Sequence, residues 1–180
     1  FKSFTTDAGQ AHQIVYGAEL EYIDVQRPRY RTAADLITQQ TTSIFGGDVF
    51  PNKSFPDTET QRTGIFINDR IELTDRATIV IGLRYDEYQL TPTTDDLFNN
   101  SNAAQNALAN IEDGAVSSKL GVLYDLSDQV SVFAQYAEGF RSPDYESANL
   151  TFTNFAYYYS VAPNPDLESE ESAGIELGLR

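Results

Sequence analysis

Aromatic residues are concentrated in one short segment in the C-terminal part of the chain. The segment contains Phe152, Phe155, Tyr157, Tyr158 and Tyr159. Aromatic faces stack on flat macrocycles or on catecholate rings, and a tyrosinate can ligate the iron of a heme. The same rings could instead pack against neighbouring loops. The segment therefore has a ligand-binding and a structural interpretation.

Other residues that commonly bind metals or catalyse reactions are sparse. His12 is the only histidine, and its place at the start of a predicted strand favours a structural role. Acidic groups at 95–96, 112–113 and 168–171 lack the spacing of a defined calcium loop, so we interpret them as solvated surface. The sequence has no cysteine, no Ser/His/Asp set and no phosphate-binding loop. We therefore expect neither enzymatic activity nor a catalytic cofactor, and the sequence identifies no metal ligands.

The composition excludes several classes of partner. The formal net charge is −15 at pH 7 with only 12 Lys and Arg residues, so the chain lacks the basic stripe that nucleic acid requires. No segment reaches the roughly 18 apolar residues of a membrane-spanning helix. The sequence starts at Phe1 without a signal peptide and contains no methionine, so we expect it to begin inside a longer protein.

Segments in which apolar and polar residues alternate occur along most of the chain. A period of two predicts strands that are apolar on one face only. The predicted strands cover 11–24, 60–73, 77–90, 114–124, 130–140 and 171–180, with a further short strand at 1–6. The clearest alternation places Ile79, Ile81, Leu83 and Tyr85 on one face and Thr78, Gly82, Arg84 and Asp86 on the other. Such strands keep the pattern over about 9–11 residues, the length that a tilted strand needs to cross a bilayer.

The connections between these strands alternate between long and short. The long ones span 25–59, 91–113 and 141–170, and the short ones span 74–76 and 125–129. Typical loops have about 4–6 residues, so a soluble β-sandwich does not explain this alternation. An outer-membrane barrel does, because its periplasmic turns are short and its extracellular loops are long. We therefore predict an all-β fold, an antiparallel transmembrane β-barrel, of which this chain supplies about six or seven strands.

Finer predictions follow from the same pattern. Arg84 and Asp86 lie two residues apart on a polar face, close enough for an ion pair in the lumen. Asp69 interrupts an apolar face, which suggests a membrane boundary. Tyrosines near strand ends would form an interfacial girdle; they are Tyr22, Tyr85, Tyr88, Tyr124 and Tyr136. Apolar residues at helical spacing predict short helices in two of the loops, over 102–111 and 32–40.

Two short motifs flank the aromatic segment. Gly139-Phe140-Arg141-Ser142-Pro143 ends one predicted strand, and Asn164-Pro165-Asp166-Leu167-Glu168 precedes the next. Pro143 has no backbone donor and so ends a ladder, whereas an Asn-Pro pair favours a turn. The arginine of the first motif could anchor the loop base to the acidic residues at 168 and 170. Taken alone, the two motifs only mark where one strand of a hairpin ends and where the next begins.

The same residues resemble a known family. The runs 135–143, 164–167 and 175–180 look like the C-terminal half of TonB-dependent outer-membrane receptors, and 64–69 and 82–86 resemble their paired mid-barrel strands. The resemblance implies a barrel of about 22 strands with an N-terminal plug. The whole chain would then be part of that barrel, without the plug or the TonB box. It further implies a location in the outer membrane of a Gram-negative bacterium, with the lipid bilayer and the TonB complex as partners. The implied function is import of a scarce ligand with energy relayed by TonB.

Within that family, the heme and hemoglobin receptors flank one extracellular loop with an FRAP box and an NPNL box. Phe140, Arg141 and Pro143 match the first box, with Ser142 in place of alanine. Asn164, Pro165 and Leu167 match the second, with Asp166 in place of asparagine. The stretch 145–156 also looks like this branch. Many such receptors place a heme-ligating histidine between the boxes, and this loop has none; degraded boxes also occur in siderophore receptors.

Several functions stay open at this point. The favoured one is capture and TonB-powered import of an iron-containing ligand, either heme or heme derived from hemoglobin, as transported ligand. The alternative within the same class is a ferric-siderophore receptor. A passive porin, an adhesive surface barrel or a soluble all-β binding module are alternatives from other classes.

Overall fold

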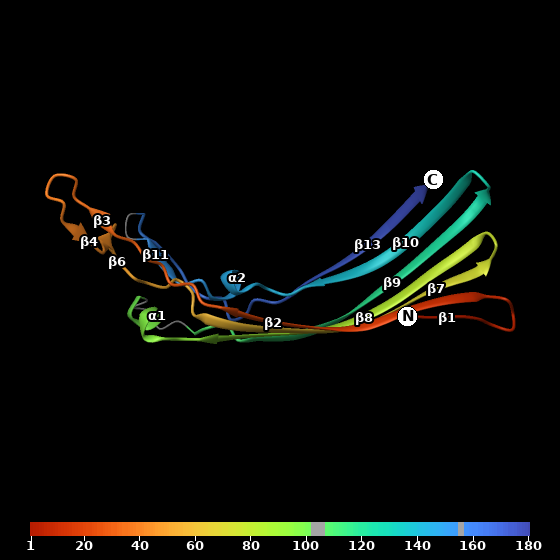
Figure 1. Ribbon diagram of the computed structural model, residues 1–180, viewed down its shortest axis with the longest axis horizontal. Helices are drawn as coiled ribbons and strands as arrows, with labels where there is room; N and C mark the ends of the chain where they lie inside the picture. The colour runs from red at the N-terminus through yellow and green to blue at the C-terminus, as the bar shows by residue number, and fades with distance from the viewer. Residues whose placement is uncertain (102–106, 155–156) are drawn as a thin grey trace.

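The main feature of the protein is one antiparallel sheet of seven strands. The computed structural model describes residues 1–101, 107–154 and 157–180. The strands are β1 (Lys2–Thr5), β2 (Ala11–Val25), β7 (Asp57–Thr74), β8 (Ala77–Thr93), β9 (Ile111–Ser127), β10 (Val130–Arg141) and β13 (Glu170–Leu179). They follow one another in the sheet in this order, and the sheet curves like a section of a barrel wall (Figure 1). All seven predicted strands are confirmed, and we call this sheet the wall.

The smaller elements lie in the long connections. They are β3 (Ala33–Ala34), β4 (Thr41–Thr42), β5 (Ile44–Phe45), β6 (Asp48–Val49), α1 (Asp96–Ser101), α2 (Tyr145–Asn149), β11 (Phe152–Asn154) and β12 (Tyr159–Val161). These elements gather at one end of the wall, and the short turns lie at the other (Figure 1). The predicted alternation of connections is therefore confirmed. Neither helix in the described part of the chain has the length and apolar character to cross a membrane.

The strand register places the apolar residues of neighbouring strands on one common face. Ile67 lies opposite Tyr16 on one side and Leu83 on the other, and Tyr85 lies opposite Val116. These large side chains stay well exposed on the chain by itself. An apolar band of this extent on a curved antiparallel sheet is typical of the lipid-facing side of a membrane barrel.

The opposite face carries paired charges. The predicted ion pair is confirmed: Nη2 of Arg84 lies 2.7 Å from Oδ1 of Asp86 and 2.7 Å from Oε2 of Glu19 on β2. Two residues farther along β2 toward the long loops, Oε2 of Glu21 lies 2.9 Å from Nη1 of Arg62. This face also carries Tyr88, whose hydroxyl donates to a carbonyl next to α2 on the concave side of the sheet (Figure 1). The polar face is therefore the concave one, which corresponds to the lumen of a barrel.

The single histidine lies at the start of β2, as predicted, at the end of the wall that carries the short turns. His12 Nδ1 is 2.7 Å from Oδ2 of Asp69, and its ring stacks on that of Phe4 with the centroids 4.8 Å apart. Phe4 and His12 are also directly paired across β1 and β2. These contacts join the three strands at that end of the wall.

The helix predicted over 102–111 is wrong where the structure describes that range. The helix of this loop is α1, which starts earlier because the Asp95 carboxylate accepts a hydrogen bond of 2.8 Å from the backbone N–H of Phe98. Farther along, Ala109 lies in no helix or strand, and its N–H and C=O form hydrogen bonds of 2.7 and 2.9 Å with the side chain of Asn149. Residues 102–106 lie outside the described part.

The helix predicted over 32–40 is also wrong. The segment is a hairpin in which β3 pairs with β4. The Asp35 carboxylate accepts hydrogen bonds from the N–H groups of Ile37 and Thr38 at 2.8 and 2.9 Å, which favours a turn. Leu36 and Ile37 are almost fully exposed and find no surface to pack on. A helix this short needs such packing to be stable.

Candidate ligand-binding site

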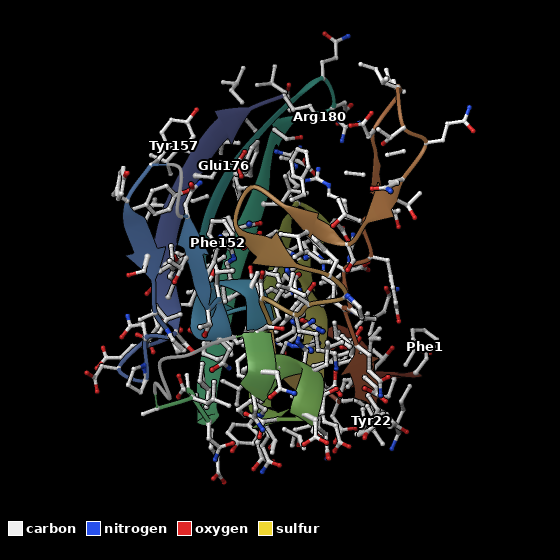
Figure 2. All side chains as sticks on the ribbon, turned by 90° about the vertical axis from the view of Figure 1, so that its left-hand side faces the viewer. Phe1, Tyr22, Phe152, Tyr157, Glu176 and Arg180 are labelled. Carbon is white, nitrogen blue, oxygen red and sulfur yellow. The ribbon has the colours of Figure 1, made fainter. Side chains whose placement is uncertain are left out.

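The three long connections interlock at one end of the wall. We call them L1 (26–56, between β2 and β7), L2 (94–110, between β8 and β9) and L3 (142–169, between β10 and β13). Each is tied to the other two by side chains, so they form one surface. Figure 2 views the molecule from this end.

A buried lysine joins L1 to L2. Nζ of Lys53 lies 2.6 Å from Oδ1 of Asp57 and 2.7 Å from Oδ2 of Asp95, and the lysine side chain is only 5% exposed. Burial alone would lower the pKa of the Lys53 ammonium, but its hydrogen bonds to the two carboxylates raise that pKa above its ordinary value. The hydrogen bond from Lys53 likewise holds the pKa of the Asp95 carboxyl below its usual range. The charged forms on both sides stabilise this link.

An arginine joins L1 to L3. Arg27 forms an ion pair with Glu146, donates to the hydroxyl of Tyr145 at 3.2 Å and lies 5.1 Å above the ring centroid of Phe55. The backbone N–H of Thr151 adds a bond of 2.8 Å to the carbonyl of Ser54 in L1. The Phe55 ring also meets that of Tyr145 in L3 edge to face, with the centroids 5.6 Å apart, so a charged, an aromatic and a backbone contact fix these two loops together.

A small apolar cluster lies under L2 and L3. Its buried members are Tyr88, Leu90, Ala109, Ile111 and Ala148. Leu167 and Tyr145 pack against it from L3. The cluster packs both loops against the ends of β8 and β9. The hydrogen bond between the Asn149 side chain and Ala109 stabilises this contact.

The two predicted motifs converge at the base of L3. The Tyr88 hydroxyl donates a hydrogen bond of 2.6 Å to the carbonyl of Pro143, and the backbone N–H of Asn164 bonds to the carbonyl of Ala148 at 3.1 Å. The Asn164 side chain also accepts from the N–H of Asp166 at 3.2 Å, and Pro165 lies within the resulting turn. In the described residues, both motifs thus support the ends of one hairpin.

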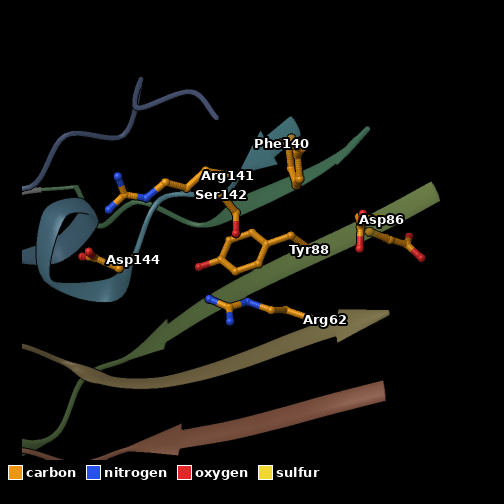
Figure 3. A pocket seen from close by; sticks show the side chains of 8 residues that line it. Arg62, Asp86, Tyr88, Phe140, Arg141, Ser142 and Asp144 are labelled. Carbon is orange, nitrogen blue, oxygen red and sulfur yellow. The ribbon is translucent and has the colours of Figure 1, made fainter. Parts of the chain in front are cut away.

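A cavity of about 410 Å³ lies on the lumenal side of this base. Its walls include Arg62, Tyr88, Phe140 and Asp144 (Figure 3). The guanidinium of Arg62 lies 5.5 Å from the Tyr88 ring centroid. Arg141 extends away from Tyr88 (Figure 3). Its Nη1 lies 3.6 Å from Oε2 of Glu170 on β13. The expected anchor at the loop base is therefore present, although both side chains are largely exposed.

Some rings of the predicted aromatic segment pack against each other, and others are exposed to solvent. Phe152 and Tyr159, on the paired strands β11 and β12, meet edge to face with their centroids 6.2 Å apart. Tyr157 and Tyr158 lie at the tip and are 78% and 94% exposed. Phe152 lies nearer the middle of the loop end and Tyr157 at its margin (Figure 2). Phe155 lies outside the described residues.

The structure adds a second group of rings and charges that the sequence analysis did not single out. Arg29 of L1 lies 5.7 Å from the Phe152 centroid and 5.9 Å from that of Phe50. Arg31 lies 4.4 Å from the Phe45 centroid and 5.8 Å from that of Phe50. A signal was available in the alternation Arg27-Pro28-Arg29-Tyr30-Arg31, because three arginines at every second position are unusual in so acidic a chain. We call Arg29, Arg31, Phe45, Phe50 and Phe152 the arginine–aromatic cluster.

This arrangement suits a flat ligand more than a bare metal ion. Within the described ranges, no group of three or more His, Asp or Glu side chains is placed to hold a metal. The exposed rings of L3 supply stacking surface and hydroxyls, and the cluster beside Phe152 supplies positive charge. Loops that carry such groups on a rigid strand scaffold are typical of binding sites.

Comparison with protein families decides the class. A family model described as TonB dependent receptor-like, beta-barrel matches residues 1–180. The chain belongs to the TonB-dependent receptor family. Members of this family are outer-membrane transporters rather than enzymes, and the predicted fold class is confirmed.

A solved receptor has the same fold. It is a double mutant of the hemophore receptor HasR of Serratia marcescens, in complex with its hemophore HasA and heme. The match has a TM-score of 0.69 and 18% sequence identity, and it covers 98% of this chain but 27% of HasR. The chain thus spans about a quarter of that receptor. A search of curated proteins returns no match.

Proposed function

We propose that this chain is part of an outer-membrane receptor that binds an iron-containing ligand and imports it with energy supplied through TonB. Heme, free or taken from hemoglobin or another heme protein, is the favoured ligand. Membership of the TonB-dependent receptor family supports the receptor class over a passive porin, an adhesive barrel or a soluble binding module. The structural similarity to a receptor solved with heme supports a fold that is compatible with heme uptake.

The observation that carries the choice of ligand is the exposed aromatic tip of L3. Tyr157 and Tyr158 present two phenols to solvent beside the packed pair of Phe152 and Tyr159. A phenolate is one of the axial ligands that proteins use for heme iron, and the rings offer flat apolar surface to a macrocycle. No other described part of the loop end exposes several hydroxyl-bearing rings in one stretch.

The binding step would take place at L1, L2 and L3, which are fixed to one another. The ligand would then pass along the concave face of the wall while the plug rearranges. The side chains of that face are paired charges such as Arg84 with Glu19 and Asp86. Because the one guanidinium of this set is shared by two carboxylates, this part of the lumenal surface presents hydrogen-bonding groups and no unpaired positive charge that would hold an anionic ligand in transit.

A ferric-siderophore receptor is the second candidate. The observation that favours it is the absence of histidine from L3 in the sequence, since His12 lies at the opposite end of the wall. Catecholate rings would stack on the same aromatic side chains.

The test is heme titration of the complete receptor in detergent, followed through the Soret band. The wild type is compared with a Tyr157→Phe/Tyr158→Phe/Tyr159→Phe variant, which removes three hydroxyls and keeps the rings. Tyr124→Phe is the matched control, because this tyrosine lies on the wall next to the short turns. We expect a Soret shift in the wild type and the control, and its loss in the triple variant.

The other outcomes separate the candidates. A shift that persists in the triple variant would keep heme as the ligand and overturn the role of these hydroxyls. No shift in any protein, together with quenching of intrinsic fluorescence by a ferric siderophore, would overturn heme in favour of the second candidate.

A further inference from the structure

Two arginines of the loop end share one aromatic ring. The guanidinium carbons of Arg29 and Arg31 lie 5.9 and 5.8 Å from the centroid of Phe50. Each also contacts a second ring, Phe152 for Arg29 and Phe45 for Arg31. The cluster therefore brings two positive charges together over apolar surface.

Carboxylates do not neutralise this pair well. The nearest is Asp48, whose Oδ2 lies 3.9 Å from Nη2 of Arg29, at the outer limit of an ion pair. Arg31 has neither an ion pair nor a hydrogen bond to any of the described residues, and its guanidinium lies against the two rings. By contrast, Arg27, two positions before Arg29, is fully engaged with Glu146 and Tyr145. The positive charge at 29 and 31 is thus left available in a chain whose net charge is −15.

The backbone holds Arg29 in place. Its N–H and C=O bond to Asn52 at 2.8 and 3.0 Å, and its Nε donates to the Asn52 side-chain oxygen at 2.9 Å. The side chain of Arg29 is still 40% exposed, and its terminal nitrogens have no closer carboxylate than Asp48 among the described residues. A guanidinium stacked on a ring keeps its edge N–H groups free, and these match a carboxylate or another planar oxyanion in a two-pronged geometry.

We propose that Arg29 and Arg31 bind the acidic groups of the transported ligand, so that this receptor selects a flat aromatic ligand that is also an anion. The inference rests on the proposed function and deepens it. It assigns recognition of the ligand's charge to two residues of L1, and stacking on the ligand to Phe152 and the other rings of L3. The two carboxylates of heme and the charge of a ferric catecholate complex both meet this requirement. A neutral flat ligand, or a neutral ferric complex, does not.

The physical reason for such a device lies in the charge of the chain. An acidic surface repels an anionic ligand, and a local pair of guanidinium groups offsets that repulsion at one point. The aromatic rings hold the guanidinium groups in place through cation–π attraction. The cluster therefore supplies both affinity and orientation.

The experiment compares charged and neutralised ligands on the complete receptor in detergent. The probes are iron protoporphyrin IX and its dimethyl ester, which has the same ring but no free carboxylates. The variants are Arg29→Gln/Arg31→Gln and Arg29→Lys/Arg31→Lys, and Arg76→Gln in a short turn at the far end is the matched control. Binding of the ester reports whether the loop surface is intact in each variant.

We expect the wild type and Arg76→Gln to bind the diacid at least about tenfold more tightly than the ester, which corresponds to about 1.4 kcal/mol. The Gln pair should lose this preference while its affinity for the ester is unchanged. The Lys pair should keep part of it, because it retains charge but not the planar fork. An unchanged preference in the Gln pair, or an equal loss in Arg76→Gln, would overturn the proposal.

Failure of the proposed heme function would give a different result. If neither porphyrin binds to any protein, the same variants are tested with an anionic ferric catecholate and a neutral ferric hydroxamate. A preference for the anion that disappears in the Gln pair would support the assignment of Arg29 and Arg31 even though heme is excluded. No preference, or one that survives in the Gln pair, would overturn it.

Discussion

The wall and the loop end hold their arginines in opposite ways. On the wall, Arg84 has two carboxylate partners at 2.7 Å on two strands. At the loop end, Arg31 lies against two rings and has no carboxylate partner among the described residues. The first arrangement satisfies the charge of the arginine within the chain, and the second leaves the charge without a carboxylate partner. We propose that this difference separates the arginines that serve the structure from those that serve recognition.

The two regions also differ in how they are held together. Each long strand of the wall is paired with a neighbour along most of its length, as in the pairing of β7 with β8 from Asp57 to Thr74. Backbone hydrogen bonds and an alternating apolar face stabilise it repeatedly, so single polar changes on the lumenal face are tolerated. The loop end depends instead on a few side-chain links such as Lys53, Arg27 and Asn149. Single changes there should act on one loop at a time.

The largest effect should come from charge on the lipid-facing side of the wall. Leu83 lies in the apolar band, opposite Ile67. Leu83→Arg should destabilise the complete receptor in lipid vesicles by about 2–4 kcal/mol, because a guanidinium near the bilayer centre is poorly solvated. Gln135→Arg, on the concave face opposite Glu176, is the matched control and should change stability little. Denaturant unfolding measures both, and equal effects would show that the two faces are assigned incorrectly.

A smaller effect should follow from loss of the buried ammonium at the loop end. Lys53→Met keeps the length of the side chain but leaves Asp57 and Asp95 without their shared cation. We expect opening of L2 to become easier by about 1–3 kcal/mol, less than for a fully buried pair because both carboxylates are partly exposed. Hydrogen exchange of peptides that contain α1 measures this, with the exposed Lys2→Met as control. Unchanged exchange would show that the apolar cluster alone holds L2.

The same link gives a pH dependence with a definite sign. The pKa of Asp95 is lowered by Lys53, so its contribution is present above the ordinary pKa of an aspartate, about 3.9, and is lost as the pH falls through the lower folded value. The pKa of Lys53 is raised, so its contribution is present below about 10.4 and is lost as the pH rises through the higher folded value. Protection of α1 should therefore be constant near neutrality and decline only at the acidic and alkaline extremes. A decline between pH 5 and 9 would contradict this assignment.

The wall could be predicted from sequence because its signal is periodic and local. Alternation in segments such as 77–90 fixes both strand and face, and the interruption of that period marks the short turns at 74–76. Two points of the prediction are wrong. The strands extend farther, as β7 starts at Asp57 and β8 continues to Thr93, where pairing outlasts the apolar pattern. Tyr88 lies buried on the concave face and not in an interfacial girdle. Residue spacing also placed the Arg84–Asp86 pair correctly, since two positions on one strand share a face.

The loop end could not be predicted in the same way because its contacts join distant parts of the chain. The apolar side chains of 32–40 have no surface to pack on, and the hydrogen bonds to the Asp35 carboxylate favour a turn instead. The neighbours of Arg29 and Arg31 include Phe152, more than a hundred positions away, and no local pattern reports such a pairing. The predicted rings of L3 are described in part, but their role in binding stays a prediction.

The smallest predicted effect concerns the motif at the base of L3. Tyr88→Phe removes the donor to the carbonyl of Pro143 and keeps the buried ring. A single hydrogen bond of this kind contributes about 0.5–1.5 kcal/mol, so peptides that contain α2 should exchange somewhat faster in the complete receptor. Tyr16→Phe, with its hydroxyl on the exposed apolar face, is the control. If ligand affinity is unchanged while exchange rises, the motif serves the hairpin; if affinity falls while exchange stays constant, Tyr88 and the cavity beside it contact the ligand.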